Sequence, residues 1–425
     1  MELKTDVVIV GAGGGGAVLG LALARKGIST VILEQAPGPP TGLRGEILQP
    51  NGQQVFESLG LLGRLPSHAI RSVRKFHFCR VGGERLCTVD YGVLPQPYNQ
   101  ALVTLPNIAH HVILDALEAC APGSLKYATA FKRLKRERNR VIGVEAESKG
   151  QAVTVSAQVV VGADGAFSKV REALGTPARV HRYRDEYLIT ILDGASDLTE
   201  ARYFVGRRTI LGIFPAAAGK AYLFYMIPAG SLPELKAQGL PILRDRWVAI
   251  DSSLGGIAQH LRDWGQTACM PTGRVEAAWW VTDGAVLIGD AAHAMNPHAS
   301  QGRMQAMMDA MALADLLPSC LERGDCSAPA LAAFEHARRP HVEMLQRVAD
   351  EQVLFWNTGN PLLASLRDRV FWTLDRNPRL RYRMLTVTAG LRAAPPFGLL
   401  DRLMAAGLLP DPHAQELPTG ATTSR

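Results

Sequence analysis

The sequence predicts an α/β fold: a Rossmann-like dinucleotide-binding domain, an inserted and mostly antiparallel β-sheet that forms a substrate domain, and C-terminal helices. Three observations predict it. A strand, a glycine-rich turn, a helix and a second strand follow one another in the first 35 residues. Strand patterns dominate from Tyr183 to Pro228, and nearly everything beyond Ser327 has the pattern of helices.

Composition agrees with a globular protein of two or three packed units. The 425 residues are 47% hydrophobic and 20% charged. The net charge of +7 favours anionic ligands but does not by itself indicate nucleic acid. None of the six cysteines forms a C-x-x-C pair or zinc spacing, so we expect reduced thiols, a cytoplasmic protein and no metal site.

The first motif predicts a phosphate-binding turn. The β-branched strand Asp6–Val10 leads into Gly11-x-Gly13-x-x-Gly16, and the helix Ala17–Lys26 follows. Gly11 permits the tight turn, Gly13 lets a pyrophosphate approach the backbone, and Gly16 lets helix and strand pack closely. The next strand ends at Glu34, where an acid binds a ribose hydroxyl. A plain strand–helix–strand unit without a ligand is the alternative.

The same region also resembles a signal peptide or membrane helix, because Val7–Ala24 is an unbroken run of apolar residues and glycine. Its centre holds Gly11 and Gly13–Gly16. Each glycine costs a helix about 1 kcal/mol relative to alanine, so the pattern favours the turn over a spanning helix.

Hydrophobic patterns and turn residues predict the remaining elements in order. A loop carrying Arg44 leads into a short helix that ends at Leu62, and later elements are strands 74–81 and 84–91, helix 108–119, a strand–turn–strand over 125–147 with its turn near Asn139, and strand 158–161. Next come strands 187–192, 201–214 and 220–227, helix 232–263, strand 285–288, helix 302–317 and a polar tail after Asp411 for which disorder is expected.

These elements divide the chain into three parts. We expect a discontinuous dinucleotide-binding domain over residues 1–72, 98–180 and 272–330, a substrate-binding sheet domain over 73–97 and 181–271, and a C-terminal helical region with the polar tail over 331–425.

Three motifs together resemble the class A flavoprotein monooxygenases, the family of p-hydroxybenzoate hydroxylase and the ubiquinone-biosynthesis hydroxylases. The first is the glycine motif with Glu34, and the second is Gly162-Ala-Asp164-Gly165, which continues to Arg171. The third runs from Gly289-Asp290 through Pro297 to Gln301-Gly302 and is followed by Asp309-Ala310. Their order matches the family, and the resemblance covers roughly residues 1–350.

The resemblance implies a set of FAD-binding residues that hold the pyrophosphate, the adenosine ribose, the adenine, the ribityl chain and the pyrimidine edge of the flavin. They are Gly11, Gly13, Gly14, Gly15, Gly16, Glu34, Arg44, His110, Phe131, Asp164, Asp290, Gly302, Arg303 and Met304. Two positions depart from the family. Its loop usually ends G-Q-G-x-N, whereas this chain has Arg303-Met304, and His110 stands where the family often has an arginine. A surface histidine is the alternative at His110.

By resemblance, the chain is a hydroxylase that uses FAD, NADH or NADPH and O₂, and that oxygenates an aromatic or quinol-like small molecule through a flavin C4a-hydroperoxide. No second G-x-G-x-x-G follows, so the nicotinamide is expected to bind transiently near Arg44 and Asp164. His298 is a candidate base, with a structural loop histidine as the alternative. Candidate pocket residues, for which the core is the alternative, are Tyr203, Phe214, Tyr222, Phe224 and Tyr225; Tyr225 is also a weak catalytic candidate.

Other functions stay open. Residues 44–50 resemble a segment of squalene epoxidases, which keeps an alkene epoxidase or an FAD-dependent reductase of a polyprenyl-type substrate as alternatives, beside a non-catalytic dinucleotide-binding protein. The basic run 132–140 fits a solvated hairpin better than a nucleic-acid patch. Residues 397–409 are apolar enough for a peripheral membrane contact, although a core cap or dimer contact fits as well, and the oligomeric state stays open.

Overall fold

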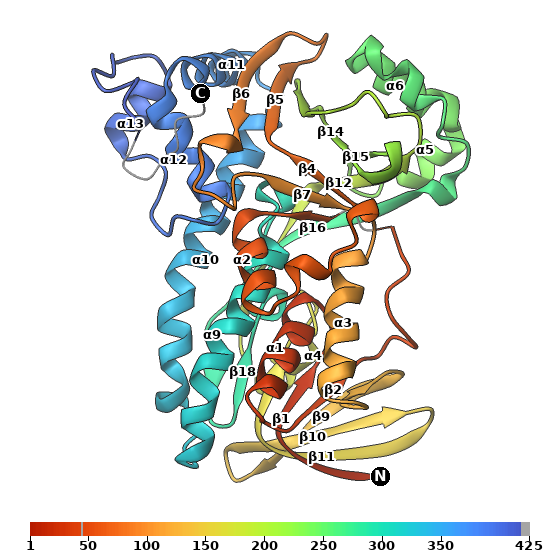
Figure 1. The fold of residues 1–425 in the computed structure, drawn as a ribbon, viewed down its shortest axis with the longest axis vertical. Helices are drawn as coiled ribbons and strands as arrows, with labels where there is room; N and C mark the ends of the chain where they lie inside the picture. Colours follow the sequence, from red (N-terminus) through yellow and green to blue (C-terminus); the bar gives the residue numbers. More distant parts are fainter. Residues whose placement is uncertain (44–45, 418–425) are drawn as a thin grey trace.

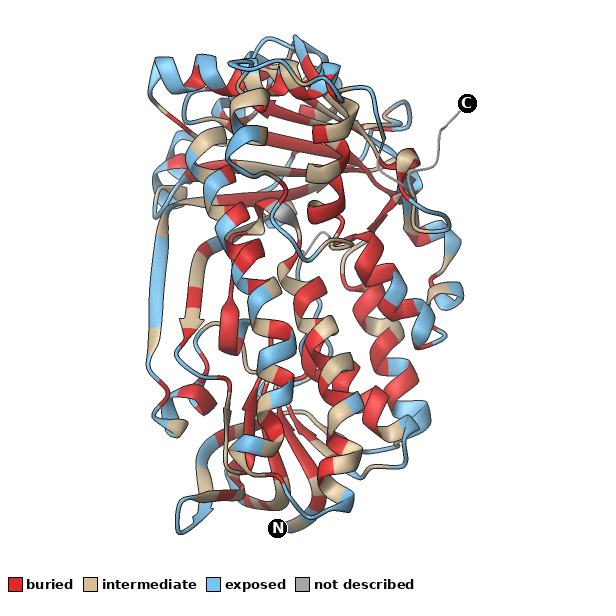
Figure 2. Cartoon of the chain, turned by 90° about the vertical axis from the view of Figure 1, so that its left-hand side faces the viewer, coloured by how far each residue is buried: buried red, intermediate tan, exposed pale blue. Residues whose placement is uncertain are grey.

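A computed structural model describes residues 1–43 and 46–417, which form two large sheets stacked along the long axis of the molecule (Figure 1). Buried residues follow the strands of both sheets and the inner faces of the long helices (Figure 2). The structure therefore confirms the predicted α/β class with a second sheet and C-terminal helices.

The first sheet is parallel at its centre. Among the described residues its strand order is β17-β18-β11-β1-β2-β8, and β9 and β10 extend it beyond β11. Val7, Val8 and Ile9 of β1 are fully buried, as expected for a central parallel strand covered on both faces. The strands are β1 (Glu2–Val10), β2 (Thr30–Leu33), β8 (Leu125–Lys126), β9 (Thr129–Glu137), β10 (Arg140–Ser148), β11 (Gln151–Gly162), β17 (Val281–Thr282) and β18 (Ala285–Leu287).

The crossover from β1 to β2 is α1 (Gly14–Arg25), which packs against α3 (Ile108–Cys120) and α9 (Gly302–Glu322). We predicted that this first helix begins at Ala17, but it begins at Gly14, so the last glycines of the motif form its first turn. Their backbone N–H groups therefore stand at the helix N-terminus, where an anion binds.

The predicted hairpin near Asn139 is confirmed as β9 and β10. Its basic run is partly neutralised across the strands, because Lys132 pairs with Glu147 at 3.1 Å and Arg133 with Glu145 at 2.7 Å. Both pairs are largely exposed, as the solvated-hairpin interpretation expected.

The second sheet has the order β16-β12-β15-β14-β13-β5-β6 among the described residues. All neighbours in it are antiparallel except β13 and β5. Its strands are β5 (Lys75–Arg80), β6 (Arg85–Asp90), β12 (Ala178–Leu192), β13 (Ala201–Val205), β14 (Ile210–Pro215), β15 (Ala221–Pro228) and β16 (Thr267–Ala277). A small sheet of β3 (Glu46–Leu48), β4 (Ile70–Val73) and β7 (Ala101–Thr104) lies between the two.

Two expected elements are divided in the structure. The predicted strand 201–214 is a hairpin, because the chain turns at Gly206, whose N–H donates to the carbonyl of Thr209. The predicted helix 232–263 is broken at Gly239 and Asp251 into α5 (Leu232–Gln238), α6 (Leu240–Ile250) and α7 (Gly255–Ala258). Glycine ends helices readily because it adopts positive φ, which is +92° at Gly239.

The C-terminal helices connect the two halves. Helix α10 (Ala328–Trp356) runs along one side of the molecule from the first sheet to the second (Figure 1). Helices α11 (Pro361–Arg376), α12 (Pro378–Thr388) and α13 (Leu399–Ala405) then pack against the second sheet, sharing one core with Phe76 and Phe78 of β5. Along residues 1–43 and 46–417, no helix is both long and apolar enough to cross a membrane.

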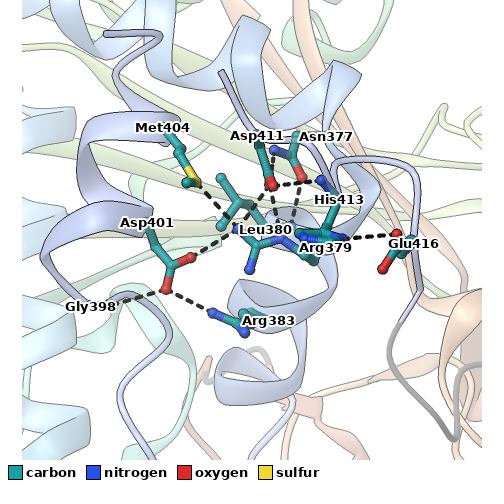
Figure 3. Close-up of polar contacts among 10 residues, drawn as sticks. All are labelled: Asn377, Arg379, Leu380, Arg383, Gly398, Asp401, Met404, Asp411, His413 and Glu416. Atoms are coloured by element: carbon teal, nitrogen blue, oxygen red, sulfur yellow. Dashed lines mark hydrogen bonds and ion pairs between the residues drawn. The ribbon is translucent and has the colours of Figure 1, made fainter. Parts of the chain in front are cut away.

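Part of the polar tail is held in place, contrary to the expectation of disorder. The Asp411 carboxylate accepts hydrogen bonds from Asn377 and Arg379, each at 2.8 Å (Figure 3). Leu417 packs against the core of the second sheet. Residues 418–425 lie outside the described residues.

Candidate functional site

The glycine-rich turn is closed on one side and open on the other. A Cβ atom added to Gly11, whose φ is +100°, would lie 2.4 Å from the carbonyl oxygen of Ala163. A Cβ on Gly16 would lie 2.0 Å from the Gly11 oxygen, whereas a Cβ on Gly13 meets nothing within 4 Å. The turn thus lies directly against the second motif and leaves a space above Gly13 that fits a pyrophosphate.

Glu34 is fixed beside this turn. Its carboxylate accepts hydrogen bonds from the backbone N–H of Ala12 at 2.9 Å and of Ala36 at 2.8 Å. A carboxylate has about four acceptor positions, so ribose hydroxyls fit the remaining ones. Phe131 is buried in β9, two residues after Thr129, whose N–H donates to the carbonyl of Glu34 at 2.9 Å. This brings β9 near the adenosine end of the expected site.

In the second motif, Asp164 has local partners: its carboxylate accepts from the Ser168 hydroxyl and from the N–H of Val170. The buried Arg171 was given no role from the sequence. Its guanidinium donates to the carbonyl oxygens of Ala166 at 2.9 Å and of Ala291 at 2.7 Å. Arg171 therefore ties the second motif to the third, which lies 120 residues further along the chain.

The turn of the third motif is held by hydrogen bonds to one buried carboxylate. Asp309 of α9 accepts hydrogen bonds from the N–H of Gly289 at 2.9 Å, from His293 at 2.5 Å and from Arg338 of α10 at 2.8 Å. Burial opposes the ionised form of Asp309, but His293, Arg338 and the Gly289 amide outweigh it and lower its pKa. This network fixes the turn that carries the exposed Asp290.

The start of α9 lies beside that turn. A Cβ built on Gly302 would lie 3.9 Å from Asp290 Oδ1. The side chain of the next residue, Arg303, extends over the first motif: a Cβ on Gly14 would lie 3.0 Å from its Cγ atom. The Arg303 Nη2 atom is 3.5 Å from Nδ1 of His110, which is buried on α3. The structure thus brings the first and third motifs together around one space.

One expected residue, Met304, does not offer its side chain to this space. The Met304 side chain is buried toward α2 (Pro50–Ser58), since a Cβ on Gly52 would lie 2.2 Å from its sulfur. Only its backbone N–H, in the first turn of α9, remains for a ligand. Arg44 lies outside the described residues.

A large apolar pocket adjoins the loop that leads into α9. It has a volume of about 520 Å³ and lies between the second sheet and the C-terminal helices. Its lining includes polar groups, among them Gln49, Tyr91, His298, Ser300 and Thr388. The Gln301 amide donates to the carbonyl oxygen of Thr388 at 2.8 Å, which links this part of the lining to the residue just before α9.

His298 is buried in the short helical turn η7 (Pro297–Ala299), and its Nε2 atom lies 2.8 Å from the hydroxyl of Tyr187. Burial lowers the pKa of His298 to about 3. Burial, with Asp185 and Tyr203, raises the pKa of Tyr187 well above its ordinary value. Both side chains are therefore neutral at pH 7 and can exchange hydrogen bonds with a hydroxyl or carbonyl group.

Of the aromatic residues expected in the pocket, only Tyr203 is among its lining residues. Phe214, Tyr222 and Phe224 pack in the core behind it. Tyr225 packs with Trp247 of α6 on the other face of the sheet, because side chains alternate along a strand, and this removes it from the pocket.

The C-terminal helices supply residues that sequence reasoning missed. Leu363, Leu366, Val370 and Leu374 line the pocket from α11, and Trp356 lines it from the end of α10. Their spacing of three to four residues is the sequence signal of one helix face. That signal alone does not tell whether the face covers a core or a ligand.

Residues 4–349 match the FAD binding domain family. The chain is 29% identical over 391 residues to a 6-methylpretetramide 4-monooxygenase of Streptomyces rimosus, covering 91% of this chain and 92% of the relative. It is 28% identical over 403 residues to a kynurenine 3-monooxygenase of Salinispora arenicola, covering 86% and 81%. Among solved structures, PqsL of Pseudomonas aeruginosa, described as a probable FAD-dependent monooxygenase, superposes with a TM-score of 0.71 at 25% identity over 87% of this chain and 98% of PqsL.

Proposed function

Because this chain belongs to the FAD binding domain family and is a flavoprotein monooxygenase of class A, we propose that it hydroxylates an aromatic small molecule with NADH or NADPH and O₂. One observation carries the proposal most directly. The segment that leads into α9 borders both the expected cofactor site and the apolar pocket. Gly302 lies beside Asp290, and His298 and Ser300 line the pocket.

In this proposal the cofactor is held at the edge of the first sheet where the parallel strands β1, β11 and β18 end. The N–H groups at the start of α1 and Arg303 hold the pyrophosphate, Glu34 holds the ribose, and Asp290 with the first turn of α9 holds the flavin end. We further propose that the discontinuous unit 1–72, 98–180 and 272–330 is the cofactor half. The sheet 73–97 and 181–271, together with α10–α13, then forms the substrate half.

When bound, FAD supplies the redox chemistry, taking electrons from the nicotinamide and using O₂ to oxygenate the substrate. The residues of the chain bind the substrate and shield it from water. The apolar walls of the pocket exclude water, and Gln49, Tyr91 and His298 hydrogen-bond the polar edge of the substrate. A histidine with a pKa of about 3 is a weak base. This favours His298 as a hydrogen-bonding partner of the substrate hydroxyl over a role in removing its proton.

The test follows both electrons and oxygen. Purified protein with FAD is mixed with NADH or NADPH and a panel of phenols, quinolones and polyprenyl compounds under ¹⁸O₂. We expect nucleotide oxidation and one ¹⁸O atom in an aromatic product. A product with a saturated double bond and no ¹⁸O would instead make the protein a reductase, and a colourless protein that binds no FAD would contradict the proposal altogether.

We also propose a peripheral membrane contact at residues 397–409, supported by the exposure of Leu399, Leu400 and Leu408. Co-sedimentation with phosphatidylcholine vesicles tests it. Replacement of Leu399 and Leu400 by serine is expected to abolish any co-sedimentation, and a protein that stays in the supernatant before replacement contradicts the contact.

A further inference from the structure

The size of the apolar pocket limits its ligand. A cavity of about 150 Å³ holds one benzene ring, and this pocket, at about 520 Å³, is roughly three to four times larger. A single-ring phenol would leave most of it empty or filled with water. The pocket therefore fits a molecule of several fused rings.

The walls favour a flat ligand over a flexible chain. Phe78 of β5 stacks on Phe371 of α11 with ring centroids 4.7 Å apart and on Tyr203 of β13 at 5.2 Å, and Trp356 meets Phe78 edge to face at 5.1 Å. All four side chains are among the lining residues of the pocket. Aromatic groups pair with one another in stacked or edge-to-face geometry, which a planar ring system satisfies and a saturated or isoprenoid chain does not.

The charged residues of the lining are already occupied. Glu351 of α10 pairs with Arg402 of α13 at 2.8 Å, and more than half of each side chain is exposed. The Arg381 guanidinium donates to the carbonyl oxygens of Leu374 and Asp375, and its charge is paired with the Asp375 carboxylate at 3.8 Å. Within the described part of the lining, no other charged side chain is present to receive a substrate carboxylate. Burying an unpaired carboxylate is costly, so the ligand is uncharged where it is enclosed.

Several polar groups of the lining lie beside the start of α9. The Tyr91 hydroxyl donates to Gln49 Oε1 at 3.0 Å, and His298 and Thr388 lie on the segments that adjoin Gln301. Apolar residues of α11 and of the segment 396–406 also line the pocket, as does the buried Gln352 of α10. A ligand with a hydroxyl- or carbonyl-bearing edge therefore finds hydrogen-bonding partners next to α9.

We propose that the substrate is an uncharged, planar aromatic compound of about three to four fused rings, whose oxygen-bearing edge lies against Gln49, Tyr91 and His298 next to the start of α9. This substrate class rests on the hydroxylase function proposed above.

Ligand binding tests the proposal without turnover. The FAD-loaded protein, without nicotinamide, is titrated with phenol, 1-naphthol, 1-hydroxyanthraquinone and anthraquinone-2-carboxylate, and binding is followed by perturbation of the flavin absorbance. We expect affinity to rise about tenfold with each added ring. The carboxylate should bind at least about tenfold more weakly than the hydroxyanthraquinone.

A matched pair of variants locates the binding. Ala406, the residue that follows α13, lines the pocket, whereas Leu400 of α13 is exposed and outside the lining. Ala406→Trp should weaken 1-hydroxyanthraquinone binding at least about tenfold while changing phenol binding less than about twofold. Leu400→Trp should change neither.

The outcomes separate this proposal from the hydroxylase function. If phenol binds as tightly as the three-ring compound, or if Ala406→Trp weakens both equally, the substrate class is wrong even if ¹⁸O enters a phenol. If the three-ring compound binds tightest and responds to Ala406→Trp, the pocket assignment holds even if no compound is hydroxylated.

Discussion

At the scale of single residues, we propose that Arg303 offers a positive charge to the pyrophosphate end of the cofactor. Arg303 stands in the first turn of α9, but its side chain lies over Gly14 of the first motif and reaches His110. By the resemblance, His110 stands at the position where the family often has an arginine. Because both groups lie at the same space, we infer that Arg303 replaces that arginine as the main cation for the phosphates.

Arg303→Met tests this exchange. A charged hydrogen bond contributes about 1.5–3 kcal/mol, so the variant should bind FAD about 10–100-fold more weakly. Fluorescence quenching of free FAD by the apoprotein measures the affinity. Arg323→Met, at the exposed end of the same helix, should leave it unchanged, and equal affinity of all three proteins contradicts the role.

His298 gives the protein a stability that depends on pH. Its pKa is about 6.5 in an unfolded chain and about 3 in the folded protein, where burial disfavours the charged form. Between these values the unfolded chain binds a proton that the folded chain does not. Stability therefore falls as the pH falls, by about 1.4 kcal/mol for each pH unit.

His298→Gln removes this contribution. Urea unfolding between about pH 4.5 and 6.5 should give a smaller pH slope for the variant. The slope should not vanish, because His341 is present in both proteins and burial lowers its pKa to about 4. An unchanged slope would show that the histidine is charged or accessible in the folded protein.

Residue roles differed in how far the sequence could predict them. The positions of Gly11 and Gly16 follow from steric demands that only glycine meets, and the structure shows those contacts at 2.4 and 2.0 Å. The face on which Tyr225 lies depends on strand register, and the roles of Arg171 and Trp356 depend on contacts across 120 residues or more. Such contacts leave no local pattern.

At the scale of elements, α13 is held over the pocket by ion pairs of unequal burial. The Asp401 carboxylate accepts from Arg379 at 2.9 Å, from Arg383 at 2.7 Å and from the N–H of Gly398 (Figure 3). The side chains of Asp401 and Arg379 are about 15% exposed, whereas those of the pair Glu351–Arg402 are over half exposed. Charged hydrogen bonds shielded from water contribute more than exposed pairs.

Asp401→Asn should therefore lower the free energy of unfolding by about 1–3 kcal/mol, and Glu351→Gln by less than about 1 kcal/mol. Limited proteolysis with trypsin provides a local measurement, since cleavage after Arg402 requires α13 to open. We expect faster cleavage in the first variant alone. Equal rates in both variants would place the main attachment of α13 in its apolar contacts.

The ends of a helix or strand could be predicted where local residues determine them. They could not be predicted where pairing between strands determines them. Asn139 marks the predicted turn between β9 and β10. The turn within 201–214 was missed because Gly206 lies in a run that otherwise has a strand pattern, and only the pairing of β13 with β14 reveals it. The break at Gly239 could be predicted from the sequence, because Gly239 stands two residues before Pro241 and both residue types interrupt a helix.

At the scale of the whole molecule, three motifs from distant parts of the chain meet at one space. Parallel pairing of β1 with β11 and of β11 with β18 puts the ends of these strands at one edge of the sheet. That meeting was predictable from the order of the motifs and the family resemblance. The pocket could not be predicted from the sequence, because it forms only where α10 reaches the second sheet and α11–α13 cover that sheet.

Arg171 links the second and third motifs through hydrogen bonds, and we expect its removal to weaken the binding of the cofactor by both motifs. A ligand that binds only the folded state stabilises it by RT ln(1 + [L]/Kd), which is about 2.7 kcal/mol at 100 times Kd. Arg171→Met leaves the carbonyl oxygens of Ala166 and Ala291 without this donor. At one fixed FAD concentration, the variant should therefore gain less stability from FAD than the wild type.

Urea unfolding with and without FAD separates this effect from a general loss of stability. Arg171→Met should lower the stability of the apoprotein by about 1.5–3 kcal/mol and should also reduce the increment that FAD adds. Arg262→Met, an exposed position in the second half of the molecule, should change neither quantity. If Arg171→Met lowers only the stability of the apoprotein and FAD adds the full increment, then the third motif holds its place without the second. In that case the hydrogen bonds of Asp309 alone would position the third motif for binding the cofactor.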